Sequence, residues 1–293
     1  MKIGFIGFGE AARAFQESLV RQDSSLTFMA YDVLLDNEGP QGASAQAMRG
    51  HDVAVALPPE TGLPQADWIF SAVTADQSLD AAKAAACYLR PGQVFFDINS
   101  VSPGRKRQSA EIVGAAGARY VDMAVMAPVY PKGHRTATLV AGKLDEPLRN
   151  RLADLQFTFE VVAEEPGAAT AIKMVRSLFV KGLEAVTVEA LLAASASGCL
   201  DQVLKSLSGS FPGLGWPEFA RYQFERTLKH GKRRAAEMRE SAATVEALRL
   251  HGALAEAIAE VEEKMGSLPP QSIQGDDLAA ELAELVALRR GPC

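Results

Sequence analysis

The sequence has few of the residues that build metal centres or disulfide frameworks. Its three cysteines, Cys87, Cys199 and Cys293, stand far apart, and its four histidines are scattered along 293 residues. An odd number of widely spaced cysteines argues against a disulfide framework, and the lack of a Cys-x-x-Cys pair or a Cys/His cluster argues against a zinc site. We therefore expect no metal, and a reducing compartment, the cytoplasm.

Long hydrophobic runs and a strong excess of one charge are also missing. No apolar run approaches the roughly 18 residues that a membrane span needs, and the first seven residues do not start a secretory signal. The 30 basic and 36 acidic side chains leave a net charge of only −6. This mild acidity gives no support to nucleic-acid binding. We expect no membrane or nucleic-acid partner, and the length favours about two domains.

The first half of the chain alternates short apolar runs with helical patterns. Helical spacing of apolar residues is clearest at 10–21, 77–88 and 103–116. Such alternation is typical of a parallel sheet that is covered by helices on both faces. The strands are predicted at residues 2–6, 26–31, 52–56, 68–73, 94–98, 120–123, 138–140 and 159–162.

The second half has no convincing strand. Residues 168–197 form a long stretch rich in Ala, Leu, Val and Glu that ends at Gly198, a typical residue for the position after a helix. Pro217 suits the first turn of another helix. Further helices are predicted at residues 202–207, 217–250, 253–265 and 276–289. The domain boundary is expected at 163–167, which gives domains 1–165 and 166–293.

The most informative motif is Gly-x-Gly-x-x-Ala, formed by Gly7, Gly9 and Ala12. In a dinucleotide-binding turn the first glycine permits the sharp bend, the second lets the backbone approach a pyrophosphate, and the small third residue keeps the helix close to the sheet. The motif alone is weak, but here it follows a strand and opens a helix, which is the required context. The fold class is therefore α/β: an N-terminal Rossmann-type parallel sheet domain followed by an all-α domain.

The cofactor preference is predicted from Asp32, which follows the second strand. A carboxylate there can accept hydrogen bonds from the adenosine ribose and repels a 2′-phosphate. Because no arginine follows it, NAD is favoured and NADP remains possible; a solvated loop carboxylate is the simpler alternative. The predicted cofactor-binding residues are Gly7, Phe8, Gly9, Glu10, Ala11, Asp32, Val73, Thr74 and Asn99.

Several segments together resemble the β-hydroxyacid dehydrogenase family, which includes 3-hydroxyisobutyrate dehydrogenase and, more distantly, 6-phosphogluconate dehydrogenase. The matches are residues 4–9, 97–103 (Asp-Ile-Asn-Ser-Val-Ser-Pro), 120–125, 139–142 and 167–173 (Gly-Ala-Ala-Thr-Ala-Ile-Lys). The resemblance covers most of the chain. The later stretch 218–240 is similar to the branch of the family with a phosphogluconate-dehydrogenase-like C-terminal domain.

The resemblance implies that Lys173 is the catalytic acid/base. A lysine can give a proton to a carbonyl oxygen or take one from a hydroxyl as hydride moves to or from the nicotinamide. Ser177 and Lys181 follow at one-turn intervals on the same helix face. Ser177 is a candidate catalytic residue, although bonding to its own helix backbone is nearly as plausible. Lys181 is expected nearer the rim, outside the site. Asn99 and Ser100 are candidate substrate contacts, or simply turn residues.

The sequence departs from the family at two places. Ser177 stands where the family usually has asparagine, and Met126-Ala127-Pro128 replaces its Ser-Gly-Gly substrate loop. The substrate's anionic group then needs another receptor. The cluster 229–234 supplies Arg233 and Arg234, which could hold it; the alternative is a solvated basic face that pairs with Glu225 and Glu237. The predicted substrate residues are Asn99, Ser100, Met126, Arg233 and Arg234.

These features predict an NAD(P)-dependent oxidoreductase that acts on a small β-hydroxy acid or its semialdehyde or keto form. An imine reductase, an oxidative decarboxylase of a sugar acid, and a non-enzymatic dinucleotide sensor are the alternatives. The apolar stretches 185–196 and 278–288 of the helical half further predict a homodimer.

Overall fold

A computed structural model describes residues 1–273, 275 and 277–290 of the chain. The chain divides into two compact units, a sheet unit from Met1 to Lys173 and a helical unit from Met174 onward. Each unit is described by itself.

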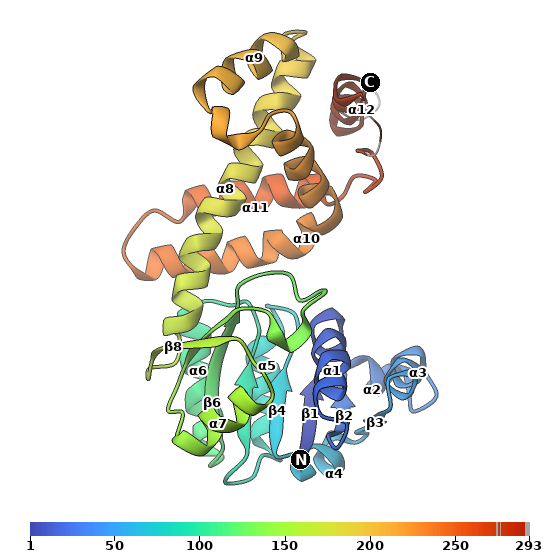
Figure 1. The fold of residues 1–293 in the computed structure, drawn as a ribbon, viewed down its shortest axis with the longest axis vertical. Helices are drawn as coiled ribbons and strands as arrows, with labels where there is room; N and C mark the ends of the chain where they lie inside the picture. Colours follow the sequence, from blue (N-terminus) through green and yellow to red (C-terminus); the bar gives the residue numbers. More distant parts are fainter. Residues whose placement is uncertain (274, 276, 291–293) are drawn as a thin grey trace. The chain divides into compact units, whose positions relative to one another are not determined.

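The sheet unit contains one eight-stranded sheet with the order β3-β2-β1-β4-β5-β6-β7-β8 (Figure 1). All neighbouring strands are parallel except β6 and β7, which are antiparallel. The prediction of a parallel sheet is therefore corrected at this pair, because the connection from β6 to β7 contains only the short 3₁₀ helix η2 and no crossover helix. The strands are β1 (Lys2–Ile6), β2 (Thr27–Tyr31), β3 (Val53–Val55), β4 (Trp68–Ser71), β5 (Val94–Asp97), β6 (Arg119–Val125), β7 (Thr138–Ala141) and β8 (Phe159–Ala163).

Helices cover both faces of this sheet. On one face a core rich in phenylalanine joins the sheet to α1, α3 and α7. On the other face a second core joins it to η1, α5 and α6. The bounds are α1 (Glu10–Gln22), α2 (Leu34–Glu38), α3 (Ala43–Gly50), α4 (Pro59–Gly62), η1 (Leu63–Gln65), α5 (Ser78–Ala86), α6 (Pro103–Ala115), η2 (Gly133–Arg135) and α7 (Glu146–Asp154).

The helical unit consists of the greater part of α8 and of the helices that follow. Two apolar cores hold it together: one joins α8 to α9, α10, α12 and the end of α11, and the other joins α8 to α10 and α11. At the crossing of α10 and α11 a Cβ atom on Gly231 would lie 2.1 Å from the carbonyl oxygen of Glu262, so only glycine fits there. The bounds are α8 (Ala168–Ala196), α9 (Leu200–Ser210), η3 (Pro212–Leu214), α10 (Glu218–Ala247), α11 (Ala253–Met265) and α12 (Leu278–Arg290).

The chain divides between Lys173 and Met174, within helix α8, whereas the sequence predicts a boundary after residue 165. The difference has a local cause, because the first turns of α8 pack with the sheet. Ala169 is fully buried in a small core with Ala124 and Ala141, on strands β6 and β7. The predicted helix terminus is confirmed: Gly198 follows α8 with a φ of 67°, which favours glycine.

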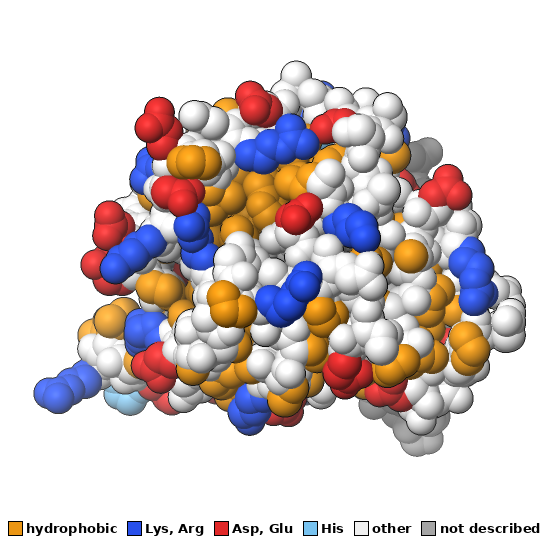
Figure 2. Space-filling model, turned by 90° about the horizontal axis from the view of Figure 1, so that it is seen from below, with side chains coloured by type: hydrophobic (Ala, Val, Ile, Leu, Met, Phe, Trp, Pro, Cys, Tyr) orange, Lys and Arg blue, Asp and Glu red, His pale blue; other side chains and the backbone are white. Residues whose placement is uncertain are grey.

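The surface shows no broad field of one charge on the face seen in Figure 2, where acidic and basic side chains are interspersed with apolar ones. This mixture agrees with the small net charge of −6. Among the described residues, no helix is long and apolar enough to cross a membrane.

Candidate active site

The glycine-rich turn lies at the carboxyl end of β1. Gly7 has a φ of 83°, and a Cβ atom there would lie 2.5 Å from the carbonyl oxygen of Ala72, so this position requires glycine. Gly9, by contrast, is exposed, and a Cβ atom there would meet nothing within 4 Å. The space above Gly9 is therefore open, as it must be if the backbone is to approach a pyrophosphate.

The start of α1 fits a phosphate group. Gly9 is the N-cap residue of α1, and no side chain caps this end of the helix. The first N–H groups of a helix have no partner within it, and the helix dipole is positive there. Glu10 and Ala11 form the first turn, with Glu10 exposed. The residues present thus fit the diphosphate of a dinucleotide.

Asp32 ties the end of β2 to this turn. Its two carboxylate oxygens accept hydrogen bonds from the N–H groups of Phe8, at 2.9 Å, and Leu34, at 3.1 Å. Carboxylate oxygens accept more than one hydrogen bond, so ribose hydroxyls can still bind. The neighbouring Asp36 instead accepts a hydrogen bond from the Tyr31 hydroxyl at 2.7 Å. Asp36, the other acidic residue near the end of β2 that could be considered for ribose binding, is therefore already paired with Tyr31.

Asn99, which follows β5, joins the carboxyl end of β5 to that of β4. Its side-chain oxygen accepts a hydrogen bond from the N–H of Val73 at 2.7 Å, and its side-chain nitrogen donates to the Ser71 hydroxyl at 2.9 Å. Thr74, which follows Val73 in the chain, is exposed. The carboxyl ends of parallel strands share one edge, where ligands bind in open α/β sheets. The predicted residues that follow β1, β2, β4 and β5 therefore meet at a single edge.

Lys173 reaches the same edge from α8. Its Nζ donates a hydrogen bond to the Ser100 hydroxyl at 2.6 Å, and both side chains are half-buried. Met126 follows β6 and packs against the core that includes Ala169, in the first turn of α8. The structure therefore brings Ser100, Met126 and Lys173 to the start of α8, although they are far apart in the sequence.

Sequence reasoning missed the charged cluster beneath this edge. Lys106 is fully buried, with its Nζ 3.0 Å from Asp97 and 3.2 Å from Asp122. A signal was available: Lys106 shares the apolar face of α6 with Ala110 and Val113. Each aspartate also stands among buried apolar neighbours in its strand: Asp97 follows Val-Phe-Phe in β5, and Asp122 lies between Val121 and Met123 in β6.

The other predicted residues belong to the helical unit. Ser177 is buried. Arg233 is exposed, whereas Arg234 is buried and its guanidinium contacts Glu184 and Glu262. Lys229 pairs with Glu225, as the alternative reading of the basic cluster expects. Their roles toward a substrate stay predictions.

The expectation that Lys181 lies near a rim is wrong, because it is only 3% exposed. Its Nζ donates to Glu237 at 2.7 Å. Burial lowers the pKa of Lys181, and the nearby Glu237 charge works against that shift. The carboxylate partner is what allows the lysine to be buried.

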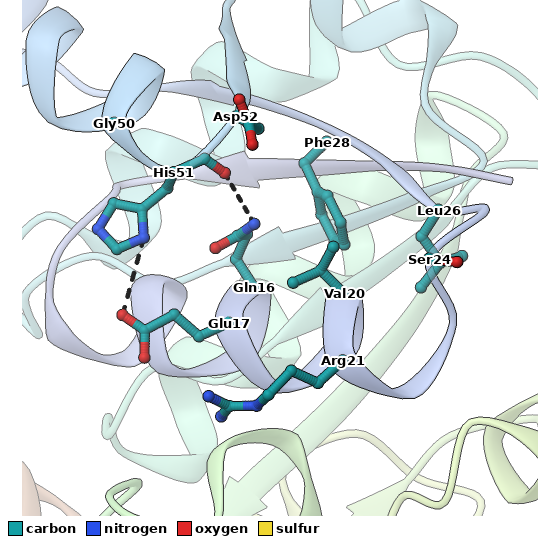
Figure 3. Close-up of a pocket in the computed structure, with 10 residues that line it drawn as sticks. All are labelled: Gln16, Glu17, Val20, Arg21, Ser24, Leu26, Phe28, Gly50, His51 and Asp52. Atoms are coloured by element: carbon teal, nitrogen blue, oxygen red, sulfur yellow. Dashed lines mark hydrogen bonds and ion pairs between the residues drawn. The ribbon is translucent and has the colours of Figure 1, made fainter.

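One open cavity of about 460 Å³ lies elsewhere in the sheet unit (Figure 3). It lies between the second half of α1 and the start of β3, where Gln16 donates to the carbonyl oxygen of His51 at 2.9 Å. Figure 3 shows the ion pair of His51 and Glu17 at its edge. None of the predicted site residues lines it. Within the described residues, no cluster of His, Cys, Asp and Glu could hold a metal ion.

Two family models match separate parts of the chain. Residues 2–100 match the family model "NADP oxidoreductase coenzyme F420-dependent", and residues 194–265 match "Domain of unknown function (DUF1932)". A conserved hypothetical protein from Sinorhizobium meliloti 1021 is 33% identical, with 99% of this chain and 96% of that chain covered and a TM-score of 0.77. The conserved protein MTH1747, which resembles 3-hydroxyacid dehydrogenases in structure, is 28% identical over 91% of this chain and 97% of its own, with a TM-score of 0.68.

A curated relative, 2-(hydroxymethyl)glutarate dehydrogenase from Eubacterium barkeri, is 25% identical over 73% of this chain and 70% of its own. Two solved structures share the fold at lower identity. The 3-hydroxyisobutyrate dehydrogenase of Mycobacterium tuberculosis is 19% identical, covers 98% of this chain and 99% of its own, and has a TM-score of 0.70. An imine reductase from Bacillus cereus is 15% identical, covers 90% of this chain and 92% of its own, and has a TM-score of 0.56.

The glycine-rich turn, the uncapped start of α1 and the family match define the sheet unit as the NAD(P)-binding domain of an oxidoreductase. The chain belongs to the β-hydroxyacid dehydrogenase family, in a branch whose helical unit contains the DUF1932 domain.

Proposed function

We propose that this protein transfers hydride between a nicotinamide dinucleotide and a small β-hydroxy acid or its semialdehyde or keto form. The observation that carries the proposal is the 2.6 Å hydrogen bond from Lys173 to Ser100, at the strand edge that also holds the glycine-rich turn. A proton donor and a hydroxyl at the nicotinamide end of a dinucleotide site suit the interconversion of an alcohol and a carbonyl.

When bound, the nicotinamide supplies or accepts the hydride. The chain then has two tasks. The start of α1 and Asp32 hold the phosphates and the adenosine ribose, which orients the dinucleotide along the strand edge. Lys173 gives a proton to the carbonyl oxygen or removes one from the hydroxyl, and Ser100 orients its Nζ. Ser177, one turn further along α8, is proposed to assist Lys173.

A screen of hydroxy acids, aldehydes and imines, followed at 340 nm with both dinucleotides, tests this proposal. We expect turnover with a β-hydroxy acid or its carbonyl form. Turnover of imines alone, or NADH binding without turnover of any compound, would overturn it. The second result would favour a dinucleotide sensor.

We propose that Arg233 binds the substrate's anionic group. Arg233 is exposed, whereas the guanidinium of Arg234 is already engaged by two glutamates. Arginine can bind a carboxylate through two parallel hydrogen bonds. Arg233→Ala should raise KM for the anionic substrate by about tenfold while NADH affinity stays unchanged. A KM within twofold of the native value would assign Arg233 to the solvated surface. Lys232→Ala, next to it and also exposed, is the matched control.

We also propose a homodimer that forms through α8. Val175, Phe179 and Val186 repeat at helical spacing, and they are 51%, 74% and 66% exposed. Such an apolar stripe favours burial against a second copy. Sedimentation equilibrium should give a dimer at micromolar concentration, and Phe179→Glu should weaken it. A native protein that sediments only at 31.2 kDa would contradict the proposal.

A further inference from the structure

Two buried carboxylates stand side by side beneath the start of α8. Asp97 and Asp122 are register partners on the parallel strands β5 and β6, and they are 1% and 0% exposed. Like charges in this arrangement repel, and burial makes each of them costly. Lys106 from α6 compensates, because its Nζ contacts both carboxylates and donates to the carbonyl oxygen of Asp97 at 2.6 Å.

Asp122 also caps α8 from a distance. Its second oxygen, Oδ2, accepts the N–H of Gly167 at 3.0 Å and the N–H of Thr170 at 3.1 Å. The carbonyl of Gly167 accepts the first hydrogen bond of the helix, from Ala171, so Gly167 occupies the capping position.

A capping side chain cannot come from position 167 itself. Gly167 has a φ of 98°, and a Cβ atom there would lie 2.9 Å from the carbonyl oxygen of Pro103. Ser, Asp or Asn would be strained at that φ and crowded as well. The carboxylate that caps α8 is therefore supplied by β6, and Asp122 fixes where the helix starts.

Asp97 holds the segment that carries Ser100, the hydrogen-bond partner of Lys173. Its carboxylate accepts the Tyr120 hydroxyl at 2.7 Å and the N–H of Asn99 at 3.0 Å. Asn99 immediately precedes Ser100. One half of the cluster thus holds the segment that carries Ser100, and the other half holds the helix that carries Lys173.

We infer that Lys106 and Asp122 are positioning residues that set Lys173 against Ser100. Neither contacts substrate; they act through the first turn of α8 and the end of β5. This inference rests on the proposed function for its effect on turnover, but its effect on the first turn of α8 can be measured independently. Thr170, whose hydroxyl donates to the carbonyl oxygen of Val101 at 2.8 Å, adds a second link between these two segments.

Charge balance gives the inference a specific test. By formal charge, the two carboxyl groups of Asp97 and Asp122 and the Lys106 ammonium sum to −1; their contacts are the two ion pairs described above. Lys106→Met removes the positive charge and brings the net formal charge to −2, whereas Asp122→Asn brings it to zero. In Asp122→Asn the single amide oxygen must face either Lys106 or the two N–H groups, so one side meets the amide NH₂ donor instead. The double variant restores the native net charge and removes Lys106, so that the asparagine oxygen can accept the two N–H groups. The double variant should therefore be closer to the native enzyme than the single variants are.

The experiment measures kcat, KM and hydrogen exchange of the peptide that spans residues 164–176. In each single variant we expect kcat to fall on the order of 10–100-fold, because small misplacements of a catalytic group have effects of this size. The KM for NADH should stay within about twofold, and exchange in the first turn of α8 should accelerate. The double variant should recover at least tenfold in kcat over the worse single variant.

Leu152→Ala is the matched control. Leu152 is fully buried in α7 of the same unit and takes no part in the site. It should lower the melting temperature without lowering kcat or changing exchange at residues 164–176. If Lys106→Met does not fold, Asp122→Asn alone carries the test.

The inference is overturned if the foldable single variants keep native kcat and native exchange in the first turn of α8. It is also overturned if Leu152→Ala lowers kcat as much as they do at an equal loss of melting temperature. Failure of the proposed function looks different: Lys173→Met would then turn over normally, or no substrate would be found, while the exchange result would still decide whether Asp122 fixes the start of α8.

Discussion

The sheet unit and the helical unit each bury a lysine among carboxylates, but they hold it in different ways. Lys106 in the sheet unit contacts two aspartates, and each aspartate also accepts hydrogen bonds from backbone N–H groups. Lys181 in the helical unit donates a hydrogen bond to the Glu237 side chain at 2.7 Å, which links α8 to α10.

The helical network continues through side chains. Arg234 on α10 contacts Glu184 on α8 and Glu262 on α11. Burial raises the pKa of the Glu262 carboxyl. Each network also contains a buried carboxylate oxygen without a hydrogen-bond partner among the described residues: Oε2 of Glu262 and, in the sheet unit, Oδ1 of Asp122, which lies 3.2 Å from Lys106. The comparison teaches that buried carboxylates which accept backbone N–H groups fix the positions of chain segments, whereas ion pairs between the side chains of different helices join those helices.

The largest contrast is expected between the two lysines of α8. Lys173→Met should lower kcat by on the order of 10²–10⁴, the range for loss of a general acid or base. NADH binding should persist, because the proposed role of Lys173 is transfer of the substrate proton and not binding of the dinucleotide. Lys181→Met should lower stability and leave kcat within a few-fold. Steady-state kinetics with fluorescence titration of NADH checks both variants, and equal losses of kcat would remove the contrast.

The two buried networks should also differ in stability. Lys106→Met leaves two buried aspartates without their cation, which should cost about 3–5 kcal/mol of unfolding free energy. Glu262→Gln should cost far less, because Glu184 still pairs with Arg234. Urea unfolding of both variants gives the comparison. If Lys106→Met lost less unfolding free energy than Glu262→Gln, the network anchored to backbone N–H groups would not be the more important one for stability, and the comparison would fail.

Asp32 is a third carboxylate that accepts backbone N–H groups, and it lies at the sheet edge that carries the glycine-rich turn. It is only half-buried. We expect the native enzyme to prefer NAD. Asp32→Ser with Val33→Arg should move the ratio of kcat/KM toward NADP by about tenfold or more, since a guanidinium pairs with the 2′-phosphate that a carboxylate repels. A native preference for NADP would contradict the assignment.

The smallest expected effect is a pH dependence of the helical unit. Because burial raises the pKa of Glu262 in the folded state, the folded protein binds more protons than the unfolded chain between pH 4.5, the ordinary pKa of this group, and the raised pKa. The stability that Glu262 contributes should therefore decrease as pH rises through its raised pKa. Glu262→Gln should remove this slope, by about 1.4 kcal/mol for each unit of the shift. Parallel slopes for the two proteins would contradict the stated effect of burial.

Much of the sheet unit could be predicted because its patterns are local. All eight strands were expected, and the glycine-rich turn needs Gly7 for a reason that the sequence shows. The short helices α3 and α7 were missed, since few apolar positions mark them. The antiparallel β7 was missed because strand direction depends on the connection rather than on the strand itself.

The candidate site was predictable only where one segment carries the signal. Lys173 and Ser100 were identified by resemblance, but their contact joins positions 73 residues apart. Asp122 caps a helix that starts far along the chain, and no local pattern shows that. The burial of Lys181 is a similar case, because its partner Glu237 lies 56 residues away.

The most direct test of the central claim, that Lys173 transfers the substrate proton, is rescue of Lys173→Ala by added primary amines. Lys173→Ala should lose activity as Lys173→Met does, and the space left by the side chain admits a small amine. We predict that methylamine or ethylamine restores turnover in proportion to its concentration, with a dependence on amine basicity that reports proton transfer. A Lys173→Ala enzyme that keeps native turnover without any amine would contradict the account.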